Sequence, residues 1–280
     1  MIEHFVQRVR NWTNRKFGFP PPLIQCQLLN HDLAVRYGTI RTRPDYDDAW
    51  LLACARNAET VFDIGANVDY SALLMLMSPT VKKMVLVEAN PDALSIAAEN
   101  LIRNHLASRV NFVSGFVGNI DGSTVKLWTI ETGAAGSLYS SHARTAAKTG
   151  CYIEVSTVKI DTLCNYYDII PDLLKIDVEG AEHSVLTGST WCARQRKTRF
   201  LVEMHANPDV TMEENTANVM NWCDSMNYRA WYLAQEAPLT SPSQITHRGR
   251  CHLLLQPENW EYPGWLVGIK QSAALEAALN

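Results

Sequence analysis

The amino-acid sequence predicts an α/β protein built on a doubly wound, mostly parallel sheet. From about residue 60 onward, short apolar runs typical of strands alternate with longer runs of helical periodicity. Strands that alternate with helices favour crossover connections and therefore a parallel sheet. The chain has 280 residues, 47% of them hydrophobic, which is enough to bury one large core. In such sheets ligands bind at the carboxyl ends of the strands, so those positions are the candidates for function.

The first half of the predicted domain supplies three strands and two helices in alternation. Residues 61–64, 84–88 and 110–113 are short apolar runs, as expected of buried strands. Residues 70–77 and 91–104 carry apolar side chains at helical spacing. The second of these helices begins with a proline, a residue that the first turn of a helix tolerates.

The pattern changes between residues 121 and 158. Asp121-Gly122 signals a turn, and the segments 124–129 and 152–158 both have strand character. The stretch between them, residues 131–150, is rich in glycine, serine, threonine and alanine. We interpret residues 121–158 as an antiparallel β-hairpin insertion whose flexible loop acts as a lid.

The alternation then resumes. Apolar runs with strand character occur twice before residue 210 and twice after residue 228, and helical stretches lie between them. The predicted strands are residues 173–177, 200–205, 229–233 and 251–256, and the predicted helices are residues 181–186 and 215–226.

Charge is unevenly distributed along the chain. The formal net charge is −4, but residues 1–43 carry +5, which leaves −9 on the remainder. The Phe-Pro-Pro-Pro run at 19–22 breaks any initial helix. We expect the basic segment to pack across the main domain, with peripheral contact to an anionic membrane as the alternative. Residues 1–44 are thus interpreted as an N-terminal basic extension, and residues 45–280 as the main domain.

Composition excludes several classes of protein. A charged fraction of 19% argues against disorder, and the acidic body provides no basic groove for nucleic acid. No apolar run approaches the ~20 residues that span a bilayer, and the first residues lack a secretory pattern. The seven cysteines show no C-x-x-C pair and no zinc spacing, so we expect reduced thiols and a cytoplasmic location.

Small and acidic residues follow the first two predicted strands. Asp63 begins a turn that contains Gly65 and Asn67, and Glu88 ends the second strand, where a carboxylate suits the hydroxyls of a ribose. The G-x-G-x-x-G fingerprint is absent, which disfavours a nicotinamide-dependent oxidoreductase. Asp63 and Glu88 therefore point to a cationic nucleoside such as S-adenosylmethionine. The alternative is that both acids only cap helices.

Charged side chains also gather at the end of the strand predicted at 173–177. Lys175 and Asp177 share one face of this strand, and a buried lysine requires a partner, either Asp177 or Glu203. We predict a polar cluster of Asp177, Glu179, Glu203 and His205 that faces the transferred group. A purely structural ion pair is the alternative.

These segments resemble a known family. The stretches DIGANVDYSALL at 63–74, VEANPDAL at 87–94, DGSTVKLWT at 121–129 and LLKIDVEGAEHSVLTG at 173–188 are similar to the FkbM family of S-adenosylmethionine-dependent methyltransferases. The likeness covers roughly residues 45–256. It implies a class I, Rossmann-like methyltransferase fold with a seven-stranded sheet, and methylation of a hydroxyl oxygen on a small molecule, a sugar or a lipid.

The resemblance also implies roles for individual residues. The turn after the first strand would line the methionine and ribose parts of the cofactor, Glu88 would hold the ribose hydroxyls, and residues 114–116 would border the adenine. The cofactor-binding residues are then Asp63, Gly65, Asn67, Glu88, Ser114, Phe116 and Asp177, and the acceptor and lid residues are Lys175, Glu179 and Ser137.

One residue departs from the family pattern. The family motif that corresponds to residues 63–69 normally reads D-I-G-A-N-x-G, and Asp69 stands in place of its last glycine. We expect its side chain to tilt outward without consequence. The alternatives are weakened cofactor binding, or a catalytically silent member that acts as a binding or scaffold protein.

Methyl transfer to a hydroxyl requires in-line placement of the acceptor, a base for its proton and exclusion of water. Asp177 and His205 are the predicted catalytic bases, with Glu203 orienting one of them. The run Asp45-Tyr46-Asp47 lies just ahead of the domain and is expected at the entrance. The carboxylates could instead hold a divalent cation. Because no segment shows a metal-ligand spacing, we predict no metal.

Overall fold

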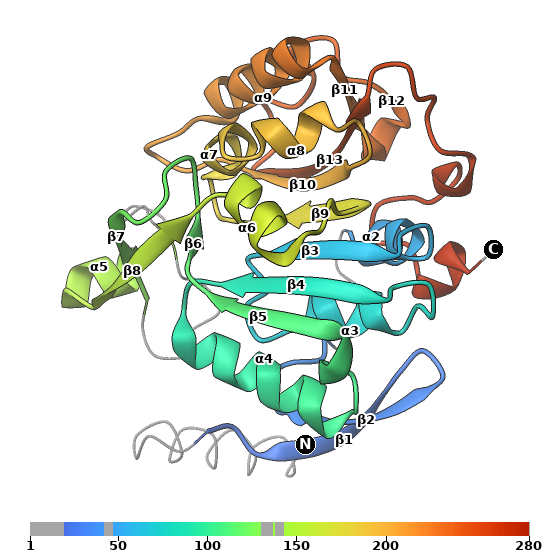
Figure 1. Ribbon diagram of the computed structural model, residues 1–280. Coiled ribbons are helices and arrows are strands. Elements are labelled where there is room, and N and C mark those ends of the chain that lie inside the picture. Colours follow the sequence, from blue (N-terminus) through green and yellow to red (C-terminus); the bar gives the residue numbers. More distant parts are fainter. Residues whose placement is uncertain (1–19, 42–46, 130–136, 138–142, 280) are drawn as a thin grey trace.

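The computed structural model describes residues 20–41, 47–129, 137 and 143–279. The basic segment 1–19, Asp45, Tyr46 and most of the predicted lid loop lie outside the described residues. The main sheet has the strand order β12-β11-β13-β10-β9-β3-β4-β5 (Figure 1). Its strands are β3 (Thr60–Ile64), β4 (Lys83–Glu88), β5 (Val110–Ser114), β9 (Leu173–Ile176), β10 (Arg199–His205), β11 (Tyr228–Tyr232), β12 (Ala237–Pro238) and β13 (Arg250–Pro257).

Five neighbouring strands of this sheet run in the same direction. β5, β4, β3, β9 and β10 pair in parallel, whereas β13 pairs antiparallel with both β10 and β11. The direction of crossover changes between β3 and β9, which places the carboxyl ends of these two strands beside a crevice. The predicted doubly wound, mostly parallel sheet is confirmed, and β12 adds a two-residue edge to the seven predicted strands.

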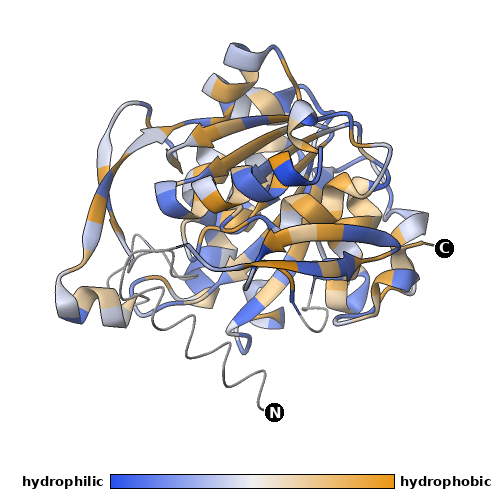
Figure 2. Cartoon of the chain, turned by 90° about the horizontal axis from the view of Figure 1, so that it is seen from below, coloured by the Kyte–Doolittle hydropathy of each residue, from blue (hydrophilic) through white to orange (hydrophobic). Residues whose placement is uncertain are grey.

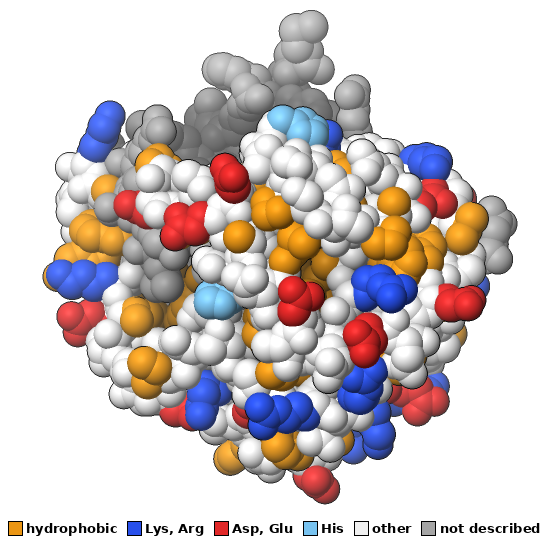
Figure 3. All heavy atoms as spheres, turned by 90° about the horizontal axis from the view of Figure 1, so that it is seen from above, with side chains coloured by type: hydrophobic (Ala, Val, Ile, Leu, Met, Phe, Trp, Pro, Cys, Tyr) orange, Lys and Arg blue, Asp and Glu red, His pale blue; other side chains and the backbone are white. Residues whose placement is uncertain are grey.

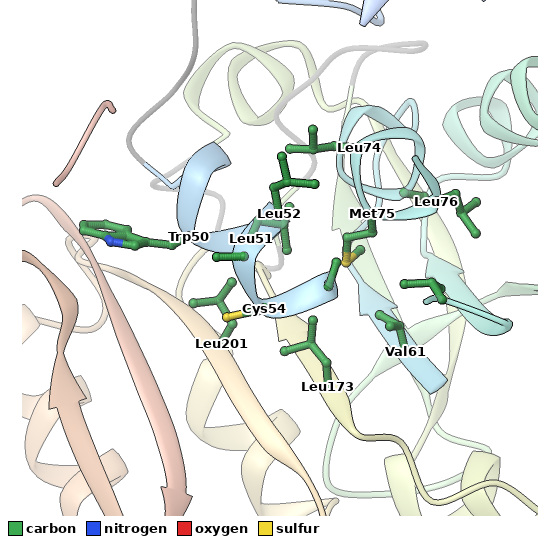
Figure 4. Close-up of a cluster of buried hydrophobic side chains, with 14 of the residues drawn as sticks. Trp50, Leu51, Leu52, Cys54, Val61, Leu74, Met75, Leu76, Leu173 and Leu201 are labelled. Carbon is green, nitrogen blue, oxygen red and sulfur yellow. The ribbon is translucent and has the colours of Figure 1, made fainter. Parts of the chain in front are cut away.

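Helices cover both faces of the sheet. The face covered by α2 and α3 includes Val61, Leu173 and Leu201, as Figure 4 shows. The opposite face, which includes Phe62 and Phe200, packs against α6, α7, α8 and α9. The α-helices are α2 (Asp48–Ala55), α3 (Tyr70–Leu76), α4 (Pro91–Arg103), α6 (Ile160–Tyr167), α7 (Glu182–Thr187), α8 (Thr190–Arg194) and α9 (Met212–Met226). Short 3₁₀ helices occur at Ala107–Arg109, Leu233–Gln235, Pro242–Gln244, Gly264–Leu266 and Leu275–Ala278.

An antiparallel hairpin precedes the main sheet and was not predicted. It consists of β1 (Leu23–Leu28) and β2 (His31–Arg36), and it lies along helix α4, on the side seen in Figure 2. The backbone N–H of Arg36 donates to Oδ1 of Asn100 on α4 at 2.8 Å, and the Arg36 guanidinium pairs with Glu99 at 2.7 Å. The part of residues 1–44 that the structure describes therefore includes a strand pair docked on the main domain.

The insertion between residues 116 and 158 forms a separate small sheet. β7 (Thr124–Trp128) and β8 (Tyr152–Val158) pair antiparallel, as predicted, and β6 (Phe116–Val117) joins β8 in parallel. Helix α5 (Arg144–Thr149) connects back into β8. Among the described residues, Ser137 bridges to Trp128 through two backbone hydrogen bonds, so it is fixed beside β7.

Two further observations concern the chain as a whole. None of the described helices combines the length and the apolar character that crossing a membrane requires. All seven cysteines are free thiols.

Candidate active site

The turn between β3 and α3 approaches the end of β9 too closely for any residue but glycine at position 65. Gly65 has a φ of +77°, and an added β-carbon would lie 1.8 Å from the carbonyl oxygen of Asp177. The Gly65 N–H donates to the carbonyl of Val87 at 3.0 Å, which ties the turn to the end of β4. The turn therefore joins the carboxyl ends of three parallel strands.

Glu88 is held in place by backbone donors at the end of β4. Its Oε2 accepts from the N–H of Asn67 at 2.7 Å, and its Oε1 accepts from the N–H of Asn90 at 2.8 Å. Burial raises the pKa of Glu88, although these two N–H donors act in the opposite direction. Each oxygen keeps a lone pair that can accept a further hydrogen bond.

A first cavity of about 80 Å³ opens at these strand ends. Its apolar side includes Val117 and Leu127, and Asn90 lines it beside Glu88. Ser114 is exposed and Asp63 is fully buried, and neither lines this cavity. The predicted site residues that do line it are Gly65, Asn67, Glu88, Phe116, Ser137, Asp177 and Glu179.

A second cavity of about 180 Å³ adjoins the first. The two share Gly65, Asn67 and Asp177, so Asp177 stands at their junction. The second cavity is strongly polar. Its ionisable lining residues are Arg41, Asp47, Asp48, Tyr70, Lys175, Asp177 and Glu203.

Lys175 links the floor of the site to the turn. Its Nζ lies 3.3 Å from Asp63 Oδ1 and 3.4 Å from Asp177 Oδ2, and it donates to the carbonyl of Gly65 at 3.0 Å. Burial lowers the pKa of Lys175, but the carboxylates of Asp63 and Asp177 more than offset this and raise it. Asp63 also accepts from the Ser71 hydroxyl at 2.7 Å. Its carboxylate thus supports the turn from behind instead of facing either cavity.

His205 lies within a group of carboxylates. Its Nδ1 is 3.0 Å from Glu182 Oε1, and its Nε2 lies 3.4 Å from Glu203, 3.5 Å from Glu179 and 3.9 Å from Asp177. Burial opposes the charged ring, but Glu182 and Glu203 raise the pKa of His205 well above its usual value. Carboxylates therefore face both ring nitrogens, an arrangement that favours the imidazolium form. The sequence analysis did not identify Glu182, which follows the matched KIDVEG run.

Glu203 contacts basic groups on two sides. Its Oε1 lies 3.0 Å from the guanidinium of Arg250, and its Oε2 lies 3.5 Å from Nε2 of His252. Although burial acts in the opposite direction, His205 and His252 lower the pKa of Glu203. His252 faces Glu203 directly across the β10–β13 pairing. Sequence analysis missed Arg250 and His252 because that register joins segments almost fifty residues apart.

The side chain of Asp69 turns into the protein rather than outward. It is fully buried, its φ is +88°, and neither carboxylate oxygen has a hydrogen-bond partner among the described residues. Burial, reinforced by the charge of Asp63, raises the pKa of Asp69 well above its usual value. Asp69 lines neither cavity, so it does not stand between the turn and a ligand.

The strand order and a ligand crevice at the switch between β3 and β9 define a Rossmann-like protein of the class I methyltransferase fold. Residues 63–230 match the family described as the methyltransferase FkbM domain. The chain belongs to this family, as its motifs predict. A search of curated proteins finds no match.

Several solved structures of methyltransferases are similar to the chain at low sequence identity. Methyltransferase FkbM from Methylobacillus flagellatus has a TM-score of 0.45 and 16% identity, over 71% of this chain and 44% of that one. TYW2 from M. jannaschii, in complex with AdoMet, has a TM-score of 0.44 and 10% identity over 84% of each chain. An O-methyltransferase from Bacillus cereus, in complex with SAH, has a TM-score of 0.42 and 11% identity, over 75% of this chain and 79% of that one. The chain spans less than half the length of the first of these proteins.

Proposed function

We propose that the protein transfers the methyl group of S-adenosylmethionine to a hydroxyl oxygen of a small, polar acceptor. The observation that carries this proposal is the pair of adjoining cavities that meet at Asp177. One is bordered by the glycine turn and Glu88, and the other by ionisable and hydroxyl side chains. Group transfer requires two ligands to be held side by side, as two cavities with a shared boundary would hold them.

The donor set of the first cavity fits S-adenosylmethionine. Glu88 is fixed by two backbone N–H groups and keeps lone pairs for the two hydroxyls of a ribose. Phe116, Val117 and Leu127 provide the apolar surface that suits an adenine ring. Asp177 and Glu179 place negative charge where a sulfonium would be stabilised. When bound, the cofactor supplies an electrophilic methyl group.

Asp177 is the base that the geometry favours. Its side chain is 26% exposed and borders both cavities, so it can reach the acceptor hydroxyl. Burial raises the pKa of Asp177 against the opposing charge of Lys175, which makes its carboxylate a stronger base than an exposed one. Asp177 takes the hydroxyl proton as the acceptor oxygen forms its bond to the methyl carbon and the sulfur–carbon bond breaks.

His205 has a positioning role in this proposal. As an imidazolium it cannot accept a further proton, but it holds Glu179 and Glu203 beside the cavities by charge. Glu182 fixes the opposite edge of the ring and itself accepts from Asn215 Nδ2 at 2.8 Å. Of the two predicted bases, the proposal therefore favours Asp177 over His205.

The second cavity supports a small, hydroxylated acceptor of the sugar or lipid-headgroup type. Arg41, Asp48 and Tyr70 border it and can form hydrogen bonds with the hydroxyl groups of such an acceptor. On the face shown in Figure 3, Lys and Arg are interspersed with Asp and Glu, without a continuous basic patch of the kind that binds phosphate backbones. The four carboxylates that line the second cavity would repel a phosphate backbone, which favours a small acceptor over a nucleic acid.

Calorimetry with S-adenosylhomocysteine tests the cofactor site. We expect micromolar binding by the wild-type chain and at least tenfold weaker binding by Glu88→Gln, because the amide cannot accept both ribose hydroxyls. Glu154→Gln, at an exposed glutamate on β8, is the matched control and should bind like the wild type. Absence of binding by the wild-type chain would overturn the proposal.

A second measurement separates binding from turnover. Asp177→Asn should bind S-adenosylhomocysteine within about threefold of the wild type. With a panel of hydroxylated sugars and lipid headgroups, its methyl transfer should fall by about 10²-fold or more. Unchanged turnover in Asp177→Asn would remove Asp177 as the base.

A further inference from the structure

We propose that Asp47, Glu203 and His252 form a binding site for a divalent first-row metal ion such as Mn²⁺ or Zn²⁺. The three residues come from the start of α2, from β10 and from β13. Nε2 of His252 lies 3.6 Å from Asp47 Oδ2 and 3.5 Å from Glu203 Oε2. One ligand atom from each residue lies within 4.8 Å of the others.

The spacing of these atoms fits a coordination shell. Ligand atoms at about 2.1 Å from a tetrahedral metal ion lie about 3.4 Å from one another. The two measured separations are 3.5 and 3.6 Å, longer than a hydrogen bond and close to that value. Small side-chain movements would therefore suffice to bind an ion.

His252 gives an independent indication of a ligand. Its side chain is 3% exposed, and its Nε2 makes no hydrogen bond to any described residue. A buried ring nitrogen without a partner is unfavourable, and a metal ion would satisfy it. The Trp50 ring packs against the His252 ring, with centroids 5.8 Å apart, and helps to hold Nε2 toward the two carboxylates.

The charges around the site favour a divalent cation. Asp47 and Glu203 are both more than nine-tenths buried and bring two negative charges to the ring nitrogen of His252. Arg250 binds Oε1 of Glu203, which leaves Oε2 directed at His252. A mixed set of two carboxylate oxygens and one imidazole nitrogen suits Mn²⁺, Fe²⁺ or Zn²⁺ better than Mg²⁺ or Ca²⁺.

A neighbouring cluster, Asp177, Glu203 and His205, is a weaker candidate. Both ring nitrogens of His205 already face carboxylates, and Glu182 is bonded to one of them at 3.0 Å. A metal ion would have to displace that imidazolium. Among the described residues, Nε2 of His252 also faces two carboxylates, but at 3.5 and 3.6 Å and without a hydrogen bond such as the one between His205 and Glu182.

The site would leave coordination positions open toward the second cavity. Asp47 and Glu203 both line that cavity, and three protein ligands do not complete the shell of such an ion. An acceptor oxygen bound there would be held close to Asp177. This last step rests on the proposed function, whereas binding of the ion does not. Asp47 and His252 also lie outside the matched residues 63–230, so the site is not part of the shared family segment.

Metal titration of the full chain tests the inference. After removal of metals with EDTA, Mn²⁺ is added and its free concentration is followed by electron paramagnetic resonance, with Zn²⁺ and Mg²⁺ compared by calorimetry. We expect one Mn²⁺ or Zn²⁺ per chain and weaker binding of Mg²⁺. His252→Gln and Asp47→Asn should each weaken binding at least thirtyfold. His183→Gln, at an exposed histidine on α7, should leave it unchanged.

Two results would overturn the site. One is no stoichiometric binding of Mn²⁺ or Zn²⁺ by the wild type, and the other is wild-type affinity in both variants, which would place the ion elsewhere. Thermal unfolding shows whether each variant is folded. If His252→Gln is not folded, metal binding by the nearly isosteric Asp47→Asn decides whether the site exists. S-adenosylhomocysteine binding is measured in parallel without metal, so loss of the metal site and failure of the proposed function are distinguishable.

Discussion

Asp69 has an unfavourable backbone conformation, and its surroundings disfavour a charged carboxylate. Its φ of +88° is strained for a residue with a β-carbon, and its buried carboxyl group lies near Asp63 without a hydrogen-bond partner among the described residues. Burial of an unpartnered carboxylate is costly, and the raised pKa of Asp69 expresses the same cost. The site tolerates this residue because the carboxyl group turns away from both cavities.

Asp69→Gly should therefore stabilise the protein. Removing the strain and the buried acid should raise the free energy of unfolding by about 1–3 kcal/mol. The pKa of Asp69 is raised in the folded state, so the protein is least destabilised below about pH 4, the unfolded pKa, where the carboxyl group is protonated in both states. The free energy of unfolding then falls as the pH rises toward the folded-state pKa. The gain should accordingly increase between pH 5 and pH 8, measured by urea unfolding.

Asp69→Ala is the control for this prediction. It removes the acid but keeps a β-carbon at positive φ, so it should stabilise less than Asp69→Gly. Because Asp69 lines neither cavity, S-adenosylhomocysteine affinity should change by less than about threefold. A tenfold tightening would instead favour a catalytically silent protein whose cofactor site Asp69 has weakened.

Residue types alone predicted some of the ionisable groups that line the cavities, but not all of these groups or their partners. Lys175 was predicted to be buried and paired, and it is, with Asp177 as one partner. Its other partner is Asp63, which was predicted to face the cofactor. The β3–β9 register pairs Asp63 with Lys175, and a single sequence does not show which side chains meet across two strands. The catalytic and binding roles of these residues stay predictions.

At the scale of elements, the turn after β3 requires a residue without a β-carbon at position 65. Gly65→Ala would place a β-carbon 1.8 Å from the Asp177 carbonyl oxygen. Gly122 is a matched control, since its φ is +70° and an added β-carbon would have no atom within 4 Å. Gly122→Ala should lower the free energy of unfolding by about 1 kcal/mol, through its backbone conformation alone.

Gly65→Ala should cost at least about 3 kcal/mol, because the turn or the end of β9 must move in addition. It should also abolish S-adenosylhomocysteine binding, whereas Gly122→Ala should preserve it. Urea unfolding and calorimetry on both variants provide the measurement. Equal costs for the two substitutions would contradict the close approach.

Elements with a periodic pattern were predicted from the sequence, and those without one were not. Helix α4 has one apolar face and a proline at its start, and it was located within one residue at its end. Helix α2 was missed because all eight of its residues are buried, so no polar face marks a helical period. The β1–β2 hairpin was missed because its two-residue turn begins with Leu29, at a φ of +52°, where glycine or asparagine is usual.

For the whole molecule, the ionisable cluster predicts how stability depends on pH. The pKa of His205 is raised in the folded state, so its contribution is present below about pH 6.5 and is lost as the pH rises through the folded value. The raised pKa values of Asp177 and Glu88 act in the same direction. Glu203 acts oppositely, because its pKa is lowered and its contribution is lost on acidification below about pH 4.5.

The melting temperature should therefore decline between pH 6 and pH 9. His205→Asn should be less stable at pH 6 and should show a shallower decline, since it has lost one of the two buried histidines whose pKa is raised. His183→Asn serves as the control and should retain the wild-type slope. Differential scanning calorimetry over this range checks the prediction, and an identical slope in His205→Asn would remove His205 as its cause.

The place of β13 has a consequence for the newly synthesised chain. This strand, residues 250–257, lies between β10 and β11, although both of those strands leave the ribosome before it. Until it emerges, β10 has an open edge and β11 has no neighbour in the sheet except the two residues of β12. Unpaired strand edges promote association between chains. The nascent protein is thus exposed to aggregation until residues 250–257 have been synthesised, and this strand joins the two parts of the sheet.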